Sequence, residues 1–166
     1  MRSIDGIVKL DDVSFTANSG EILGIAGISG CGQKELLEAI AGLQPTESGS
    51  ICYVEDDGTR EELLGKDPLR IAEMGVALSF VPEDRLGMGL VGNMDLSDNM
   101  MLRSFRKGHG ILTDRKAPRK LAETVVEELD VNTPGVTTPV RRLSGGNVQK
   151  VLVGREIASA PTVLLT

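Results

Sequence analysis

Short apolar runs alternate with glycine-rich and polar turns along most of this chain of 166 residues. Residues 22–26 form an apolar run between polar residues and a glycine-rich turn, which predicts a buried strand of the parallel type. After the turn, apolar residues recur at helical spacing from Leu36 to Ala41, and Gly42 and Pro45 are stop signals for a helix. We therefore expect a strand, a glycine-rich loop and a helix, in this order.

The next part of the chain has the pattern of a hairpin, a short helix and a further strand. Strand-like runs at residues 50–54 and 61–64 flank an Asp-Asp-Gly turn, which predicts a β-hairpin. A helix is predicted over residues 68–74, because a proline suits its first turn. Residues 76–81 form another apolar, strand-like run, which a proline ends.

The second half of the chain is mainly helical in its pattern. Residues 95–129 show helical periodicity, and Pro118 can open a helix whose apolar face ends at Leu129. Another helix follows two glycines at 145 and 146 and is expected to end at Pro161, after which residues 163–165 begin an apolar strand. Strands that alternate with helices in this way predict the α/β class.

Composition narrows the possible functions. The net charge of −6 argues against nucleic-acid binding through a basic surface. No apolar run approaches the roughly 18 residues that span a bilayer, and the first residues lack a signal-peptide pattern. Two cysteines are too few for a disulfide framework and fit a reducing cytoplasm. Glycine is abundant, with 20 residues, whereas aromatic residues make up only 2% of the chain.

Residues 103–120 concentrate positive charge and contain a single acidic residue, Asp114. We favour a solvated helix and loop face for this segment, and contact with anionic lipid or a partner stays as the alternative. The basic residues are Arg103, Arg106, Lys107, Arg115, Lys116, Arg119 and Lys120.

The glycine-rich turn has the spacing of a Walker A phosphate loop, in which four residues separate Gly27 from Gly32. Glycines let successive backbone N–H groups curl around a phosphate, and the N-terminus of the following helix favours an anion. The candidate nucleotide-binding residues are Gly27, Ser29, Gly30, Cys31, Gly32, Gln33, Lys34 and Glu35.

The loop nevertheless departs from the motif. Gln33 stands where a lysine should reach the β- and γ-phosphates, and Lys34 stands where a serine or threonine should hold Mg²⁺. One residue further along a helix turns a side chain by about 100°, so Lys34 does not replace the missing lysine. Glu35 adds negative charge beside the loop. From this motif alone, a nucleotide site and a ligand-free turn both stay open.

A second glycine motif decides between these interpretations: the signature residues Leu143, Ser144, Gly145, Gly146 and Asn147. With the first loop, in this order and at this separation, it resembles the Leu-Ser-Gly-Gly-Gln signature of ABC-transporter ATP-binding cassettes. Three departures are similar to the second, degenerate cassette of tandem ATPases that serve simple-sugar and nucleoside importers. They are Gly-Cys-Gly-Gln at 30–33, Val-Pro-Glu-Asp-Arg at 81–85 and the asparagine at 147.

This resemblance implies a P-loop NTPase fold of the ABC ATPase type. Such a fold has a central, mostly parallel sheet, an antiparallel β part and a helical subdomain. The resemblance implies one partial cassette over residues 1–166. The P-loop core and β part would extend to about residue 90, the helical subdomain over about 91–146, and the signature helix with the start of the Walker B strand over 147–166.

The resemblance also implies that parts of the cassette lie outside the chain. The Walker B aspartate, the catalytic glutamate and the switch histidine would follow Thr166, and the adenine-stacking ring would precede residue 1. His109 is expected to be a surface residue and not the switch histidine. We therefore expect no catalytic residue within these residues, and no ATP hydrolysis by them alone.

In the family, each ATP lies between the P-loop of one cassette and the signature motif of its partner. The resemblance thus implies the ATP-binding component of an importer for simple sugars or nucleosides, which couples ATP binding and hydrolysis to solute uptake. The signature residues would act on ATP held by a partner cassette, in the same polypeptide or in a dimer. The degenerate loop would bind ATP and Mg²⁺ weakly or not at all.

Further partners implied are membrane permease subunits, which place the protein peripherally at the cytoplasmic face of the membrane; nucleic acid is not expected. The alternative is a non-catalytic, P-loop-shaped module that dimerises or docks without using nucleotide.

Glu83 takes the position of the family's Q-loop glutamine, which senses Mg²⁺ and relays to the membrane domain. A Mg²⁺ ligand and a charged turn residue both stay open for it. Met88, Met94, Met100 and Met101 follow, and the family would place them against the permease. Met is flexible enough for such a groove, but gap-filling in the core is the favoured role.

Overall fold

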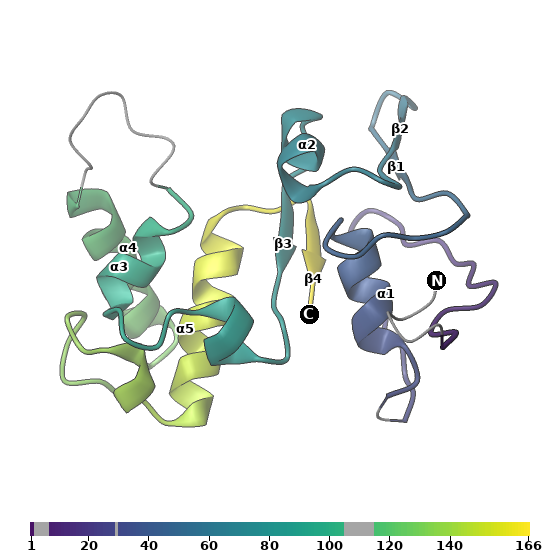
Figure 1. The fold of residues 1–166 in the computed structure, drawn as a ribbon. Coiled ribbons are helices and arrows are strands. Elements are labelled where there is room, and N and C mark those ends of the chain that lie inside the picture. The colour runs from purple at the N-terminus through teal and green to yellow at the C-terminus, as the bar shows by residue number, and fades with distance from the viewer. Residues whose placement is uncertain (2–6, 29, 105–114) are drawn as a thin grey trace. The chain divides into compact units, whose positions relative to one another are not determined.

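The structure is a computed structural model that describes residues 1, 7–28, 30–104 and 115–166 (Figure 1). The chain divides into two compact units, Met1–Leu78 and Ser79–Thr166. Each unit has its own set of elements, and each is described below by itself.

In the first unit, helix α1 (Gln33–Ile40) follows the glycine-rich loop directly. Its N-cap, Gly32, has a φ of 100°, a left-handed conformation that favours glycine. Gly42 ends the helix region with a φ of 72°, and a Cβ there would lie 2.4 Å from the Lys66 carbonyl oxygen. The predicted helix and its glycine stop are confirmed.

The predicted hairpin is also confirmed, with shorter strands. Strands β1 (Cys52–Val54) and β2 (Arg60–Glu62) pair antiparallel, with Cys52 opposite Glu62. The Glu62 carboxylate accepts hydrogen bonds from the Ser50 hydroxyl, from the Ile51 amide at 2.8 Å and from the Leu64 amide at 2.9 Å. These bonds lower the pKa of Glu62 to about 2, with the Ser50 bond as the largest cause. The carboxylate therefore ties both ends of the hairpin together.

We expect the hairpin to lose stability in acid through Glu62. Its carboxyl has a pKa of about 2 in the folded chain and 4.5 ordinarily. The unfolded state thus binds the proton first, so the contribution is complete above pH 4.5 and disappears as the pH falls towards 2. Because the residue is exposed, the contribution stays below about 1 kcal/mol. Hydrogen exchange of the Ile51 and Leu64 amides checks this: Glu62→Gln should raise exchange at pH 6 and remove its dependence on acid, whereas equal exchange in both proteins would contradict it.

Helix α2 (Pro68–Glu73) begins at the predicted proline. The side chain of Asp67 caps it by accepting a hydrogen bond from the Arg70 amide at 2.8 Å. Ile71 is 1% exposed and anchors the helix in the unit.

The expected strand at residues 22–26 is wrong. This segment is extended but belongs to no strand, and its side chains are open to solvent: Ile22 is 99% exposed and Ile25 is 43% exposed. A strand needs a neighbour to bond its N–H and C=O groups, and no strand among the described residues pairs with this segment. The apolar pattern therefore does not lead to burial here.

In the second unit, β3 (Leu78–Phe80) and β4 (Val163–Leu165) form a two-stranded sheet. Both strands were predicted, and the Val81 amide extends the pairing by donating to the Leu165 carbonyl at 2.8 Å. The π-helical turn η1 (Arg85–Gly89) follows β3, and the 3-10 turn η3 (Val140–Arg142) precedes the last helix.

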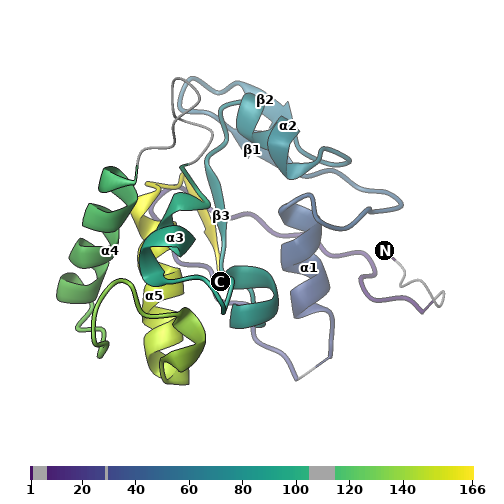
Figure 2. The ribbon, with the colours of Figure 1, turned by 60° about the vertical axis from the view of Figure 1, so that its left-hand side comes forward.

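Three helices build the core of this unit: α3 (Leu96–Met101), α4 (Lys116–Glu128) and α5 (Gly145–Ala158). Helices α4 and α5 lie side by side in both views (Figures 1 and 2). The core is apolar and includes Leu96, Met100, Ala122, Val125, Val140, Val148, Val151 and Leu152.

Glycine at 154 allows α4 and α5 to approach closely. A Cβ at Gly154 would lie 2.6 Å from Val125 Cγ1 and 2.9 Å from Leu129 Cδ1, closer than side chains pack. Helix α4 begins two residues before the predicted start at Pro118. The proline still lies in the first turn, where a backbone N–H has no partner within the helix.

The methionines divide between core and surface. Met100 is 1% exposed, as expected for a gap-filling residue, whereas Met88 is 50% and Met94 is 36% exposed. His109 and the basic residues Arg106 and Lys107 lie outside the described residues. No described helix has the length and apolar character needed to cross a bilayer.

Candidate functional site

The phosphate-loop-like segment occupies residues 27–32, directly before α1. Gly30 and Gly32 have φ values of 83° and 100°, so both use the left-handed conformation. Ser29 lies outside the described residues. The Cys31 amide donates to the Ile28 carbonyl at 3.2 Å, which tightens the turn ahead of the helix. The first N–H groups of α1 have no acceptor within the helix and are the part of this segment that suits an anion.

Side chains of the loop fold back over its own backbone. Gln33 Nε2 donates to the Ile25 carbonyl at 2.8 Å, and the Cys31 thiol lies 3.9 Å from Gln33 Oε1. A Cβ on Gly27 would lie 2.3 Å from Cys31 Sγ. The space that the bare glycine leaves beside the backbone is therefore filled by the thiol, and Gln33 is directed towards residue 25.

The two charged residues after Gln33 both have partners. Lys34 Nζ lies 3.8 Å from Glu38 Oε1, and Glu35 Oε1 lies 3.4 Å from Lys9 Nζ. Glu38 is 4% exposed and also accepts a hydrogen bond from Gln44 Nε2 at 2.9 Å. Lys34 therefore extends along α1 towards Glu38, and the positive charge of Lys9 offsets Glu35.

In the second unit, Ser144 is the N-cap of α5, and Gly145 and Gly146 form the start of its first turn. All three residues are exposed. Two adjacent glycines leave the backbone N–H groups of this turn without a shield of side chains. The N-terminus of α5 therefore presents exposed donors and the positive end of the helix dipole, an arrangement that favours an anion.

Asn147 binds both the cap and a distant loop. Its Nδ2 donates to Ser144 Oγ at 2.9 Å, and its Oδ1 accepts from the Asn132 amide at 3.0 Å. The sequence pointed to Asn147 through its motif, but it gave no sign of Asn132.

The turn after Glu83 is bonded to the signature helix at two places. Arg85 Nη1 donates to the Gly145 carbonyl at 3.3 Å, and Arg155 Nη2 donates to the Gly89 carbonyl at 2.7 Å. Glu83 itself is exposed, and within the described part of the chain the structure gives it no hydrogen bond or ion pair. The turn and the helix therefore form one bonded substructure of the second unit, with the Glu83 carboxylate open to solvent beside it.

A buried ionic network holds the other end of α5. The Glu156 carboxylate, 1% exposed, pairs with the guanidinium groups of both Arg155 and Arg103. Arg103 Nη2 also donates to the Ser79 hydroxyl at 3.0 Å, which reaches the end of β3. Burial lowers the pKa of Arg155, and the neighbouring Glu156 opposes that effect. The sequence pattern did not reveal this network.

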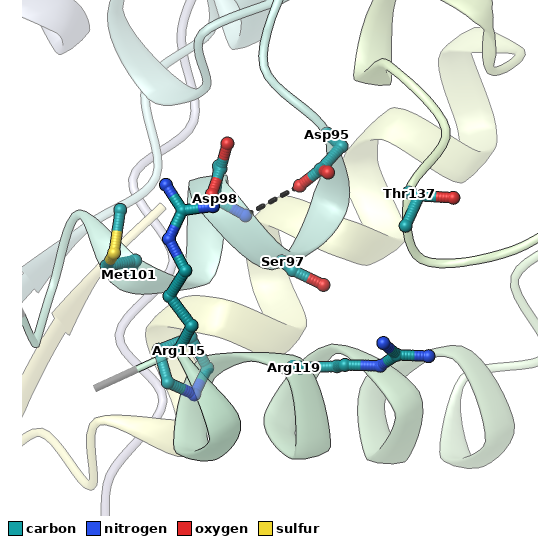
Figure 3. A pocket seen from close by; sticks show the side chains of 8 residues that line it. Asp95, Ser97, Asp98, Met101, Arg115, Arg119 and Thr137 are labelled. Carbon is teal, nitrogen blue, oxygen red and sulfur yellow. Dashed lines mark hydrogen bonds between the residues drawn. The ribbon is translucent and has the colours of Figure 1, made fainter. Parts of the chain in front are cut away.

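A small pocket lies between α3 and the start of α4 (Figure 3). Its volume is about 170 Å³, below the several hundred Å³ of typical ligand sites. Asp95 and Asp98 come from the start of α3, while Arg115 and Arg119 come from the start of α4. The Asp95 carboxylate accepts from the Asp98 amide at 2.7 Å and so caps α3. The pocket is too small for a nucleotide.

Metal-binding geometry was also sought. Within the ranges that the structure describes, no three His, Cys, Asp or Glu side chains lie together in a way that could hold a metal ion.

Comparisons with known proteins place these segments in a family. The family described as "ABC transporter" matches residues 10–166. The guanosine import ATP-binding protein NupO of Bacillus subtilis is 38% identical over 99% of this chain and 32% of its own length. The glucose import ATP-binding protein TsgD13 of Haloferax volcanii is 39% identical over 96% of this chain and 29% of its own length. The chain thus spans about a third of the curated relatives it matches.

A solved structure agrees on the fold. The ATP-binding cassette MJ0796, a dimer in a post-hydrolysis state bound to ADP and Pi, matches with a TM-score of 0.73. The match has 22% sequence identity and covers 94% of this chain and 64% of that chain. The expected α/β fold of the ABC ATPase type is confirmed, and so is the resemblance to sugar and nucleoside import proteins. The chain belongs to the ABC transporter family.

Proposed function

We propose that this chain is part of the ATP-binding component of an importer for simple sugars or nucleosides. The single observation that carries the proposal is the N-terminus of α5, where Ser144 caps the helix and Gly145 and Gly146 expose backbone N–H groups. These donors suit the terminal phosphate of ATP bound to the P-loop of a partner cassette. Relatives named as guanosine, glucose and nucleoside import proteins support the solute class.

The phosphate loop of this chain has the weaker role in the proposal. Without a lysine at 33 and a hydroxyl at 34, the loop lacks its ligands for the β- and γ-phosphates and for Mg²⁺. Cys31 and Gln33 also fold over the loop. ATP and Mg²⁺ therefore bind weakly or not at all at residues 27–35, and residues 1–166 alone do not hydrolyse ATP.

The proposed assembly follows from these two roles. One partner is a second cassette with an intact phosphate loop, in the same polypeptide or in a dimer, as the dimeric MJ0796 cassette illustrates. The other partners are membrane permease subunits, which would hold the protein at the cytoplasmic face of the membrane. Glu83 and the exposed Met88 lie in the segment proposed to transmit ATP binding to the permease, within the P-loop core that precedes a helical subdomain at about residues 91–146.

Substitutions in the two motifs of the assembled ATPase test the proposal. Ser144→Arg should remove most ATP turnover, because its bulk and flexible stem disrupt the cap at the partner's phosphate. Gln33→Ala should change turnover by less than about twofold, since the degenerate loop contributes little. Steady-state hydrolysis of Mg-ATP measures both, together with the number of tight ATP sites by titration. Two equally tight and equally active sites, or the reverse ranking of the variants, would contradict the proposal.

A module that docks without nucleotide is the second candidate, and the covered phosphate loop favours it. In that case the Ser144→Arg assembly would turn over ATP like the unaltered one. Mg-ATP would then also fail to raise the melting temperature of the assembly through this chain, since a ligand stabilises only a native state that it binds.

A further inference from the structure

The Ser144 hydroxyl lies next to the Asn147 side-chain amide, in the segment to which the proposed function assigns a phosphate. The inference below concerns that contact and rests on the proposed function. Asn147 Nδ2 lies 2.9 Å from Ser144 Oγ, and the Asn147 backbone amide lies 3.5 Å from the same oxygen. Ser144 is exposed, and Asn147 is partly buried.

The direction of the amide follows from its second contact. The Asn132 backbone N–H, 3.0 Å from the Asn147 side chain, can only donate. The atom facing it must therefore be the acceptor, Oδ1, and the opposite atom, the NH₂ group, must face Ser144. A flipped amide would set two donors against each other at Asn132 and is excluded by hydrogen-bond chemistry.

This direction fixes the role of the serine. Because the NH₂ group donates, Ser144 Oγ accepts, and the hydroxyl hydrogen is not used in this contact. Within the described part of the chain the structure gives the hydroxyl no acceptor. Its hydrogen is thus available to an incoming acceptor on the exposed side, where the N–H groups of Gly145 and Gly146 also lie.

We propose that Asn147 is a positioning residue that holds the Ser144 hydroxyl as a hydrogen-bond donor to a phosphate oxygen of the partner cassette's ATP. The backbone of residue 132 orients the Asn147 amide, the amide occupies the oxygen of Ser144, and the hydroxyl hydrogen is left for the nucleotide. Asn147 does not touch the nucleotide in this arrangement, so it acts only through Ser144. A donor that is already oriented needs no reorganisation when the phosphate arrives.

An acceptor in place of the NH₂ group should reverse the hydroxyl. Asn147→Asp has the same shape and retains an oxygen for the Asn132 N–H. Its second oxygen faces Ser144 and takes the hydroxyl hydrogen away from the nucleotide. Asn147→Ala removes the orienting group and leaves the hydroxyl free to rotate. We expect kcat for ATP to fall about tenfold with Asn147→Ala, as for the loss of one hydrogen bond to a charged group, and further with Asn147→Asp.

A double-mutant cycle with Ser144→Ala gives the decisive test in the assembled ATPase. If Asn147 acts through the hydroxyl, Asn147→Ala lowers kcat by less than about twofold once Ser144→Ala is present. A structural role would instead lower kcat by the same factor in both backgrounds, and that result overturns the inference. The similar shape of aspartate keeps the cycle usable if Asn147→Ala does not fold.

The same data separate this inference from the proposed function. If Ser144→Ala leaves turnover unchanged, the signature segment does not act on ATP, and both proposals fail. If Ser144→Ala lowers turnover and the Asn147 effects multiply, the proposed function stands and the positioning role of Asn147 fails.

Discussion

Replacing Glu156 by glutamine is expected to destabilise the second unit by about 3 kcal/mol. The carboxylate is 1% exposed and pairs with both Arg155 and Arg103. Its neutral amide would leave the guanidinium of Arg155, whose side chain is 8% exposed, without a counter-charge. Breaking one side of a buried ion pair costs about 3 to 5 kcal/mol, because the remaining charge stays desolvated. Urea unfolding, followed by circular dichroism, measures the change.

The surface pair on α4 gives a matched control for this substitution. Arg119 and Glu123 lie 3.1 Å apart, with side chains 64% and 54% exposed. Glu123→Gln makes the same chemical change in water and should cost less than about 0.5 kcal/mol. Equal effects of the two substitutions would show that burial of the Glu156 network does not set its strength.

Leu152→Ala is expected to cost about 2 to 5 kcal/mol. Leu152 is 0% exposed on α5, in the cluster that joins this helix to the rest of the second unit. The substitution removes three buried carbon atoms and leaves a cavity, which adds to the lost transfer free energy. The same urea unfolding experiment reports the change in free energy.

Ile157→Ala tests whether burial, and not the helix itself, determines this cost. Ile157 lies on the same helix but is 54% exposed. Its truncation should change the free energy of unfolding by less than about 1 kcal/mol, since surface substitutions usually have small effects. A large loss at Ile157 together with a small loss at Leu152 would contradict the packing described for α5.

The elements that the sequence predicted well are those with local signals. A proline at the start of α2, a glycine after α1 and the Asp-Asp-Gly turn between β1 and β2 each act within a few residues of their element. The segment at residues 22–26 has an equally clear apolar pattern, but a strand depends on a partner that local sequence does not specify. Its exposed Ile22 shows the limit of a pattern that assumes such a partner.

The candidate site shows the same division. Ser144 and its two glycines could be recognised from the sequence, because a cap and a bare first turn are local features. The contact of Asn147 with Asn132 spans 15 residues, and that of Arg103 with Glu156 spans 53. No periodicity links residues at such separations, so these contacts become visible only in the folded chain.

Gly154 has a mechanical consequence for the helix that carries the signature residues. Val125 and Leu129 of α4 and its C-cap occupy the space where a larger residue at 154 would place its Cβ. Sliding α5 along α4 by one turn, about 5.4 Å, would bring a different residue, with a side chain, opposite Val125. The glycine thus works like a notch that sets the axial register of the two helices. Any force on α4 then reaches the Ser144 end of α5 as a displacement of the whole helix, without slippage between the pair.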